Sequence, residues 1–354
     1  MKNKIITITF LIIIGFMFIM FIILPDTDLS YFERRRLAKF PTKWDDEKMD
    51  NYLLDQFPFR NGFIKLNSLI NRNIYNKLDT NNVYVVDGYL IDKEYPVKQK
   101  EIDGFVNKMN YIWANYLQSS NVYYSIIPDK AYFLDENKYL KMDYSQVYVD
   151  LKNISGSYID ITSVLTLEDY YKTDIHWKQE NLDKVVKTLM PNMGHIYKEL
   201  EYELNSCGYE EFAGASYSKA GGVVAKDTLT YLTNYITESA VVKHLEYGEK
   251  PVYDTAKLTG VDAYDVFLSG PSSLIKITNV FSDTNKELVI FRDSFSSSLI
   301  PLLIPYYNKI TVVDLRYITS DMLEKYVDFK NKDVLILYST QIINNSTMLK
   351  VNVK

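Results

Sequence analysis

The stretch Glu287-Leu288-Val289-Ile290-Phe291-Arg292-Asp293-Ser294-Phe295 decides the predicted fold of this 354-residue chain. The run from Glu287 to Phe291 is typical of a buried strand, and the segment from Ser296 to Ile304 can form a helix. A turn from a strand to a helix lifts a serine hydroxyl above the edge of a sheet and directs free helix amides toward a developing oxyanion. Ser294 lies at this turn. A Ser or Asp here can also serve only as the N-cap of the helix.

A second string, Asp174-Ile175-His176-Trp177, holds the partners that such a serine needs. In an extended segment, side chains two residues apart leave the same side of the backbone, so Asp174 and His176 can lie together. The acid would orient the His, and the His would take the proton of the Ser. We therefore predict an acyl-transfer site made of Ser294, His176 and Asp174.

Strand and helix patterns alternate along the chain. An Asp-Gly turn between two apolar runs predicts a hairpin at 83–91. Such alternation predicts an α/β domain of three α/β/α layers with a mainly parallel sheet, spanning residues 82–354. The further predicted strands are 122–127, 158–161, 287–291, 310–314 and 334–338, and the predicted helices are 98–118, 178–189, 296–304 and 321–326.

Ligands of such sheets bind at the carboxyl ends of the strands, where Ser294, Arg316 and Tyr338 all fall. Arg316 could bind the carboxylate of a glycan or steady developing negative charge, and Tyr338 could donate to the same oxygen. Alternatively, Arg316 pairs with Asp314 or Asp333, and Tyr338 caps the edge of the sheet.

Aromatic residues near the Asp-x-His-Trp string are candidates for stacking on sugar faces. Tyr171 and Trp177 are such candidates, together with Tyr170 and Tyr217, although several of the 31 Tyr must be core or surface residues. The glycine-containing segment 206–264 is expected to be an irregular loop and hairpin region, which could form a lid over the site. Its stretches 212–216 and 219–222 could supply oxyanion amides, or they could be only turns.

The N-terminal stretch from Ile5 to Leu24 contains 20 residues without a charge, enough to cross a hydrocarbon core of roughly 30 Å. Two Lys precede it and two Asp follow it. The positive-inside tendency therefore predicts that residues 1–24 are a short cytoplasmic end and a single membrane anchor, with the main domain outside the cell. A cleaved signal peptide is the alternative, but no small-x-small cleavage pattern follows the run.

Residues 25–81 are predicted to form a connector and a helical lead-in. Apolar residues at three- and four-residue steps between 44 and 77 predict helices that pack on the main domain. In Glu33-Arg34-Arg35-Arg36 we expect a local salt-bridge cluster, because the anionic lipids of the inner leaflet are absent outside the cell. The expected pairs join Arg34 and Arg60 to Glu33 and Asp55.

Composition excludes several classes of function. A hydrophobic fraction of 47% can bury a full core, and a net charge of −5 without a basic stripe gives no case for nucleic-acid binding. The single Cys207 excludes a disulfide framework and a Cys-based zinc site, and three scattered His argue against any metal site. His195 and His244 lie in polar stretches and are expected at the surface. We expect a mechanism without a metal or a cofactor.

The string Tyr170-Tyr171-Lys172-Thr173-Asp174-Ile175-His176-Trp177 resembles the signature of the DHHW proteins of Gram-positive bacteria, relatives of the alginate O-acetylation proteins AlgJ and AlgX, whose catalytic domain is SGNH-hydrolase-like. The second signature position is Ile175 here. The glycine usual before Asp-Ser is Arg292, which changes the close backbone approach that glycine permits. The other resembling strings stand in the family's order: Glu33 to Pro41, Asp55 to Arg60, Arg292 to Phe295, and Asp314 to Tyr317.

The resemblance implies an extracytoplasmic O-acetyltransferase that modifies an exopolysaccharide or another cell-envelope glycan. It gives Ser294 the role of nucleophile, His176 that of base and Asp174 that of acid. It also implies a multi-pass membrane O-acyltransferase partner that delivers the acetyl group. The acid and base precede the nucleophile in the chain, whereas ordinary SGNH esterases place the Ser near the start. A carbohydrate acetylesterase and a glycan-binding scaffold subunit of an export complex remain alternatives.

Overall fold

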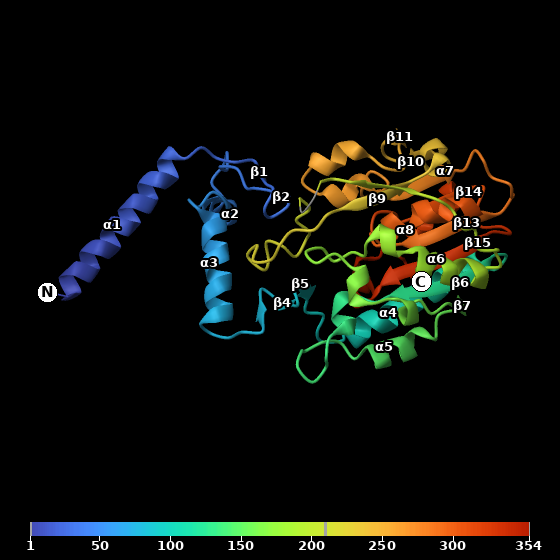
Figure 1. Ribbon diagram of the computed structural model, residues 1–354, viewed down its shortest axis with the longest axis horizontal. Helices are drawn as coiled ribbons and strands as arrows, with labels where there is room; N and C mark the ends of the chain where they lie inside the picture. The colour runs from blue at the N-terminus through green and yellow to red at the C-terminus, as the bar shows by residue number, and fades with distance from the viewer. Residues whose placement is uncertain (1, 209–210, 354) are drawn as a thin grey trace.

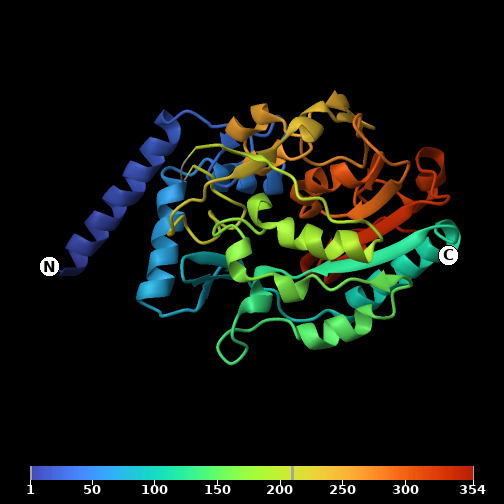
Figure 2. The same cartoon turned by 45° about the vertical axis from the view of Figure 1, so that its right-hand side comes forward.

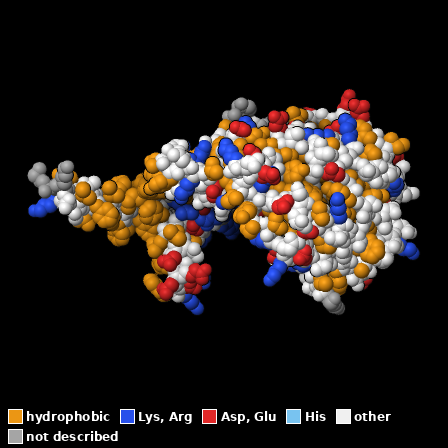
Figure 3. All heavy atoms as spheres, turned by 90° about the horizontal axis from the view of Figure 1, so that it is seen from below, with side chains coloured by type: hydrophobic (Ala, Val, Ile, Leu, Met, Phe, Trp, Pro, Cys, Tyr) orange, Lys and Arg blue, Asp and Glu red, His pale blue; other side chains and the backbone are white. Residues whose placement is uncertain are grey.

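The computed structural model of the protein describes residues 2–208 and 211–353. Helix α1 (Lys2–Ile23) projects from the main body, and helix α3 stands between α1 and the sheet in both ribbon views (Figures 1 and 2). Hydrophobic side chains cover α1, whereas the main body shows a mixed surface (Figure 3). From Asn3 to Ile23 this helix is long and apolar enough to cross a membrane.

The connector after α1 contains a two-stranded ribbon and two helices. Strand β1 (Leu29–Ser30) pairs with β2 (Arg35–Arg36), and helices α2 (Asp46–Asp55) and α3 (Arg60–Asn73) follow. Helix α3 contacts the main domain through Ser68, whose hydroxyl donates to the carbonyl oxygen of Ala220 at 2.7 Å. Each of the two helices has one buried residue, Tyr52 in α2 and Ser68 in α3. Large apolar residues of the lead-in stay exposed, among them Phe63, Leu66 and Ile74.

A small three-stranded sheet leads into the main domain. Strands β3 (Asp79–Thr80), β4 (Val83–Val86) and β5 (Tyr89–Asp92) are antiparallel, as the hairpin pattern predicts. Asp87 and Gly88 both have positive φ, which the tight turn between β4 and β5 requires.

The main sheet has eight strands in the order β11-β10-β12-β14-β13-β15-β6-β7. The five strands from β14 to β7 run parallel, which confirms the predicted largely parallel sheet, and β12, β10 and β11 form an antiparallel extension. The strands are β6 (Asn121–Ile127), β7 (Ser157–Tyr158), β10 (Val241–His244), β11 (Gly248–Lys250), β12 (Leu274–Thr278), β13 (Glu287–Arg292), β14 (Lys309–Val313) and β15 (Asp333–Ser339).

The segment 206–264 is more regular than predicted. Its strands β10 and β11 belong to the main sheet, and a separate hairpin joins β8 (Glu203–Ser206) to β9 (Thr230–Thr233). The short helix α7 (Tyr235–Ser239) leads from β9 to β10. The repeated glycines of this segment suggested loops, but Val241 and Val242 pair with Thr278 and Ile277 of β12 and so extend the sheet.

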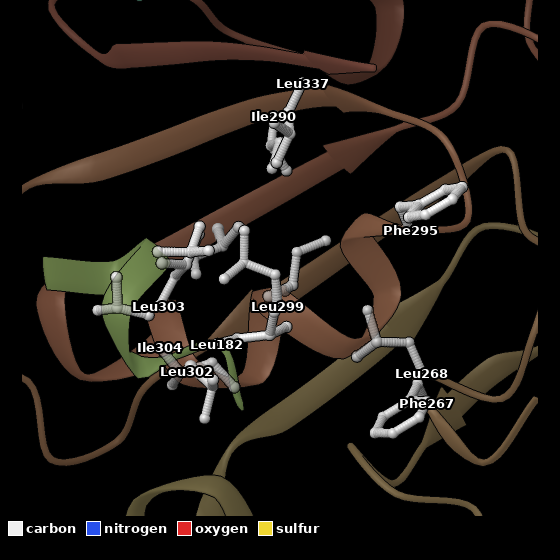
Figure 4. Close-up of a cluster of buried hydrophobic side chains, with 14 of the residues drawn as sticks. Leu182, Phe267, Leu268, Ile290, Phe295, Leu299, Leu302, Leu303, Ile304 and Leu337 are labelled. Atoms are coloured by element: carbon white, nitrogen blue, oxygen red, sulfur yellow. The ribbon is translucent and has the colours of Figure 1, made fainter. Parts of the chain in front are cut away.

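Helices cover both faces of the sheet. On one face α6 (Asp183–Asn192) and α8 (Ser296–Leu303) bury leucines against the sheet, and Figure 4 shows Leu299 and its neighbours on α8 facing Ile290 of β13 and Leu337 of β15. On the other face α4 (Gln99–Tyr116) and α5 (Tyr144–Leu151) pack on β6, β13 and β15. Helices α9 (Leu323–Tyr326) and α10 (Thr340–Ile343) are short.

Candidate active site

Three side chains from distant parts of the sequence form one hydrogen-bonded chain. His176 Nε2 lies 2.8 Å from Ser294 Oγ, and His176 Nδ1 lies 2.5 Å from Asp174 Oδ1. Asp174 is fully buried, His176 is 7% exposed and Ser294 is half-buried, so accessibility rises from the acid to the hydroxyl. This is the arrangement in which a carboxylate orients an imidazole and the imidazole accepts a proton from a nucleophile.

The buried carboxylate of Asp174 is fully satisfied. Its Oδ1 also accepts the backbone N–H of His176 at 3.0 Å, while its Oδ2 accepts Ala215 N–H at 2.8 Å and Arg34 Nη1 at 2.9 Å. Burial alone would raise the pKa of Asp174, but His176 and Arg34 outweigh burial and hold this pKa well below its usual range. The acid is therefore ionised and fixed in place.

The backbone of the Asp-x-His-Trp string bends where an extended segment was expected. Tyr170 and Trp177 form an isolated antiparallel bridge, so the residues between them make a tight loop. Asp227 holds this loop, because its carboxylate accepts the N–H groups of Lys172 and Thr173 at 2.8 Å and 2.7 Å. The bend, closed by the bond from His176 N–H to Asp174, brings the acid and the imidazole together.

Buried Lys130 supports the same loop. Its Nζ donates to the carbonyl oxygens of Tyr171 at 3.1 Å and Lys172 at 3.3 Å. Burial lowers the pKa of Lys130 to about 8.

Ser294 lies at the turn between β13 and α8, as the strand-to-helix pattern predicts. Asp293 locks this turn, because its Oδ1 accepts Phe295 N–H at 3.0 Å and its Oδ2 accepts Ser339 N–H at the end of β15 at 2.7 Å. The turn is thus tied to the neighbouring parallel strand, which holds the Ser294 hydroxyl at the carboxyl edge of the sheet.

An aromatic ring covers the imidazole. Tyr264 stacks on His176 with ring centroids 3.9 Å apart and planes 6° apart, and Phe295 contacts the imidazole at a centroid distance of 4.8 Å. The Tyr264 hydroxyl lies 3.0 Å from Ser298 Oγ of α8. This packing restrains the rotation of the imidazole, since one ring face is covered by a side chain that is itself anchored.

A small pocket of about 30 Å³ opens beside Ser294. Arg292 and Arg316 line it on one side, and Tyr264, Asp265 and Gly270 line it on another. Burial, followed by repulsion from Asp262, raises the pKa of Asp265 to about 6. A larger hollow of about 720 Å³ lies at the amino ends of β13 and β14, at the opposite edge of the sheet, and Ser294 and His176 do not line it. The candidate site is therefore identified by the side chains around Ser294 and not by the volume of the pocket.

The two arginines of the pocket differ in how their donors are used. Arg316 binds Asp314 in a bidentate pair, with Nε to Oδ1 at 2.9 Å and Nη2 to Oδ2 at 2.6 Å, which was the alternative considered for it. Arg292 is 1% exposed and donates through Nη1 to Ser297 Oγ at 3.1 Å. Its Nε and Nη2 have no hydrogen-bond partner among the described residues.

Several predicted substrate-binding side chains are buried in the core. Trp177 is fully buried and donates from Nε1 to the carbonyl oxygen of Phe295 at 2.8 Å. Tyr171 and Tyr338 are also fully buried, and Tyr338 packs edge-on against Phe105 of α4. The expectation that these three side chains face a sugar is corrected, because none presents a surface to solvent.

Other expectations are corrected as well. Tyr170 is fully buried and donates to the carbonyl oxygen of Pro128, whereas Tyr217 is half-buried against Phe32. The amide of Ala215, considered for an oxyanion site, serves Asp174 instead. His195 and His244 are largely buried and not surface residues, with side-chain exposure of 8% for His195 and residue exposure of 4% for His244.

Arg34, Tyr264 and Asp227 were missed as site residues by the sequence reasoning. Arg34 was expected to pair with Glu33 or Asp55, but it reaches Asp174 and also forms an ion pair with Asp262. Arg35 binds Asp55 instead. No spacing rule could have found these residues, since each is far in sequence from its partner. The Glu33 to Pro41 string was the one available signal.

Comparison with solved structures identifies the fold. A DHHW family protein from Eubacterium siraeum superposes with a TM-score of 0.61 at 20% identity, over 76% of this chain and 94% of that one. The chain has the fold of a DHHW protein. The resemblance predicted from the motifs is thereby confirmed at the level of the fold. No protein-family model and no curated protein matches the chain.

Two further solved structures are similar to the chain to different degrees. Bacillus cereus PatB1 with a sulfonyl adduct superposes with a TM-score of 0.59 at 16% identity, over 76% of this chain and 98% of that chain. The O-acetyltransferase domain of Pseudomonas putida AlgJ gives a TM-score of 0.45 at 12% identity, over 74% of this chain and 92% of that chain. The latter likeness is too low to carry an argument.

Gly214→Ala tests how tightly the acid is enclosed. A Cβ on Gly214 would lie 2.3 Å from the Cβ of Asp174 and 2.4 Å from its backbone N, so the acid must move. Displacing a catalytic group by about 1 Å can cost about 100-fold in rate, and we expect a loss of that order in acetyl release from an activated ester. Gly62→Ala is the matched control, because its Cβ meets no atom of the described residues within 4 Å. Equal rates for the two variants would contradict the enclosure.

Proposed function

We propose that the protein is a membrane-anchored O-acetyltransferase that modifies a cell-envelope or exported polysaccharide outside the cell through an acyl-serine intermediate. The observation that carries this proposal is the continuous hydrogen-bonded chain from Ser294 through His176 to buried Asp174. The fold shared with the DHHW protein and PatB1, together with the sequence motifs that resemble O-acetylation proteins, supports acetyl transfer.

The geometry supports a two-step transfer. In the first step Ser294 Oγ forms a bond to the donor carbonyl carbon while His176 Nε2 takes the hydroxyl proton. The bond to the donor oxygen then breaks, and His176 returns the proton to that oxygen. In the second step His176 takes a proton from a sugar hydroxyl, whose oxygen attacks the carbonyl carbon of the acetyl-serine. The bond from that carbon to Ser294 Oγ then breaks, and His176 returns the proton to Ser294 Oγ. Asp174 holds the imidazole and stabilises its cationic form in both steps.

The pocket beside Ser294 suits a small acyl group and the charge that develops on it. Its volume of about 30 Å³ is close to the share of one water molecule in the liquid, so it favours a small acyl group over a long acyl chain. We assign the unpartnered Nε and Nη2 donors of Arg292 to the oxyanion of the tetrahedral intermediate. In this assignment the Arg in place of the usual glycine supplies donors from its side chain.

The N-terminal helix supports a location at the cell membrane. In our proposal α1 is a single-pass anchor with its N-terminus in the cytoplasm and the sheet domain outside the cell, because Lys residues flank one end and Asp residues the other. A multi-pass membrane O-acyltransferase is the partner proposed to deliver acetyl groups to Ser294. A polysaccharide is the proposed acceptor.

An acetyl-transfer assay tests this function. The full chain in nanodiscs is given an activated acetyl ester and a panel of envelope glycans, and acetate release and sugar acetylation are measured together. We expect slow release of acetate and measurable acetylation of sugar hydroxyls, because both outcomes start from one acyl-serine and differ only in the acceptor. Rapid release of acetate from acetylated glycans with no transfer would favour an acetylesterase. Glycan binding without either activity would favour the scaffold role.

A further inference from the structure

The membrane-proximal connector contributes a side chain to the candidate active site. Arg34 lies just before β2, and its own φ is +55°, a conformation that a non-glycine residue rarely adopts. Its side chain is 10% exposed and donates from Nη1 to Asp174 Oδ2 at 2.9 Å. Its Nη2 forms an ion pair with Asp262. One guanidinium thus joins the connector, the acid and the segment that leads to Tyr264.

The connector is held in this position by other ion pairs. Glu33 accepts Arg60 Nε at 2.8 Å, and Arg35 Nη2 lies 2.5 Å from Asp55 Oδ1. Both partners belong to α2 and α3 or their ends, so the lead-in helices fix the backbone on each side of Arg34. The connector therefore presents Arg34 from a braced loop, which favours one direction for its side chain.

We propose that Arg34 is a positioning residue of the acyl-transfer site, supplied by the segment that follows the membrane anchor. Arg34 binds Oδ2 of Asp174, which leaves Oδ1 directed at the imidazole of His176. Arg34 also binds Asp262, two residues before the Tyr264 that stacks on this imidazole. This inference rests on the proposed acyl-transfer function. It adds that the acid–base pair is complete only when the connector is docked.

The contact between Arg34 and Asp174 also limits the distance between the candidate site and the membrane anchor. Ten residues separate Ile23, the end of α1, from Arg34, and a fully extended segment of that length spans at most about 40 Å. The backbone of Arg34 must then lie within that distance of the outer end of the anchor, and Asp174 lies one hydrogen-bonded arginine side chain further away. The site would therefore receive its substrates close to the bilayer, where a polysaccharide chain or an acyl donor leaves a membrane partner.

The test compares Arg34→Ala, Arg34→Lys and Arg36→Ala in the full chain. Arg36 is an exposed residue two positions away, so it controls for changes in the connector. We measure acetyl release from an activated ester and the rate at which a sulfonyl fluoride labels Ser294. We expect Arg34→Ala to lower kcat and the labelling rate by about 10- to 100-fold with little change in KM. Arg34→Lys should retain part of the rate, and Arg36→Ala all of it.

Added guanidinium ion separates positioning from support of the fold. If Arg34 acts through Asp174, millimolar guanidinium chloride restores part of the rate of Arg34→Ala and does not affect Arg36→Ala. A wild-type rate in Arg34→Ala, or a lost rate that neither Lys nor guanidinium restores, would overturn the proposal. Slower labelling of Ser294 in Arg34→Ala would support the positioning role of Arg34. Failure of the wild-type chain to transfer acetyl to any glycan would contradict only the proposed function, and it would leave this positioning role standing.

Discussion

Ser294→Ala is expected to remove both acetyl transfer and acetate release, with a loss on the order of 1,000-fold or more. The hydroxyl that forms the acyl intermediate is then absent, while its hydrogen bond to His176 at 2.8 Å lies at the half-open edge of the sheet and is not needed for folding. The rates are measured on the full chain with an activated acetyl ester, and mass spectrometry of the wild type should show an acetyl or sulfonyl group on Ser294.

Ser296→Ala is the matched control for this loss. Ser296 is the first residue of α8, two positions after Ser294; it is fully buried, and its hydroxyl has no hydrogen-bond partner among the described residues. Removing an unsatisfied buried hydroxyl is nearly neutral or slightly stabilising, so both activity and stability should persist. If Ser294→Ala kept its activity, or if Ser296→Ala lost it equally, the nucleophile would have been assigned to the wrong residue.

Trp177→Ala is expected to lower the free energy of unfolding by about 3 to 5 kcal/mol. The indole is fully buried, and its Nε1 donates to the carbonyl oxygen of Phe295 at 2.8 Å. It also packs edge-on against Phe295, with ring centroids 5.9 Å apart. Truncation would leave a cavity beneath the Ser294 turn and would remove the hydrogen bonds of the indole to the Phe295 carbonyl oxygen and to Ser298 Oγ. The measurement is chemical denaturation of the full chain in detergent, followed by fluorescence.

Trp44→Ala provides the comparison, because Trp44 is 80% exposed. Its removal should change the free energy of unfolding by no more than about 0.5 kcal/mol. A sugar-stacking Trp177 would give a different result, with a raised KM for glycan and an unchanged stability. That outcome would restore the role that the sequence suggested and would remove the structural role assigned by burial.

Local patterns were sufficient for much of the architecture. The apolar run at 287–291 and the following helix-forming segment predicted β13 and α8 nearly to the residue, since each element satisfies its own backbone and its own hydrophobic pattern. The Asp-Gly turn predicted the β4–β5 hairpin for the same reason. The prediction of a loop and hairpin region at 206–264 did not include the place of β10 and β11 in the main sheet, because that place depends on the pairing of β10 with β12, which lies further along the chain.

Residue types also determined the candidate chemistry. Spacing alone can recognise two motifs in this sequence: an Asp two residues before a His, and a Ser at a strand-to-helix turn. The structure brings these side chains together. Motif order further predicted the DHHW-type fold.

Only the tertiary structure decided which side chains complete the site and which are buried. Arg34 meets Asp174 across 140 positions of the sequence, and Tyr264 meets His176 through the packing of a loop. Conversely, Tyr171, Trp177 and Tyr338 looked like binding residues by type and place, but packing closed them off from solvent. The physical reason is the same in each case. Sequence patterns record a residue's local conformation and polarity, whereas contact, burial and charge compensation depend on which distant segments fold against it.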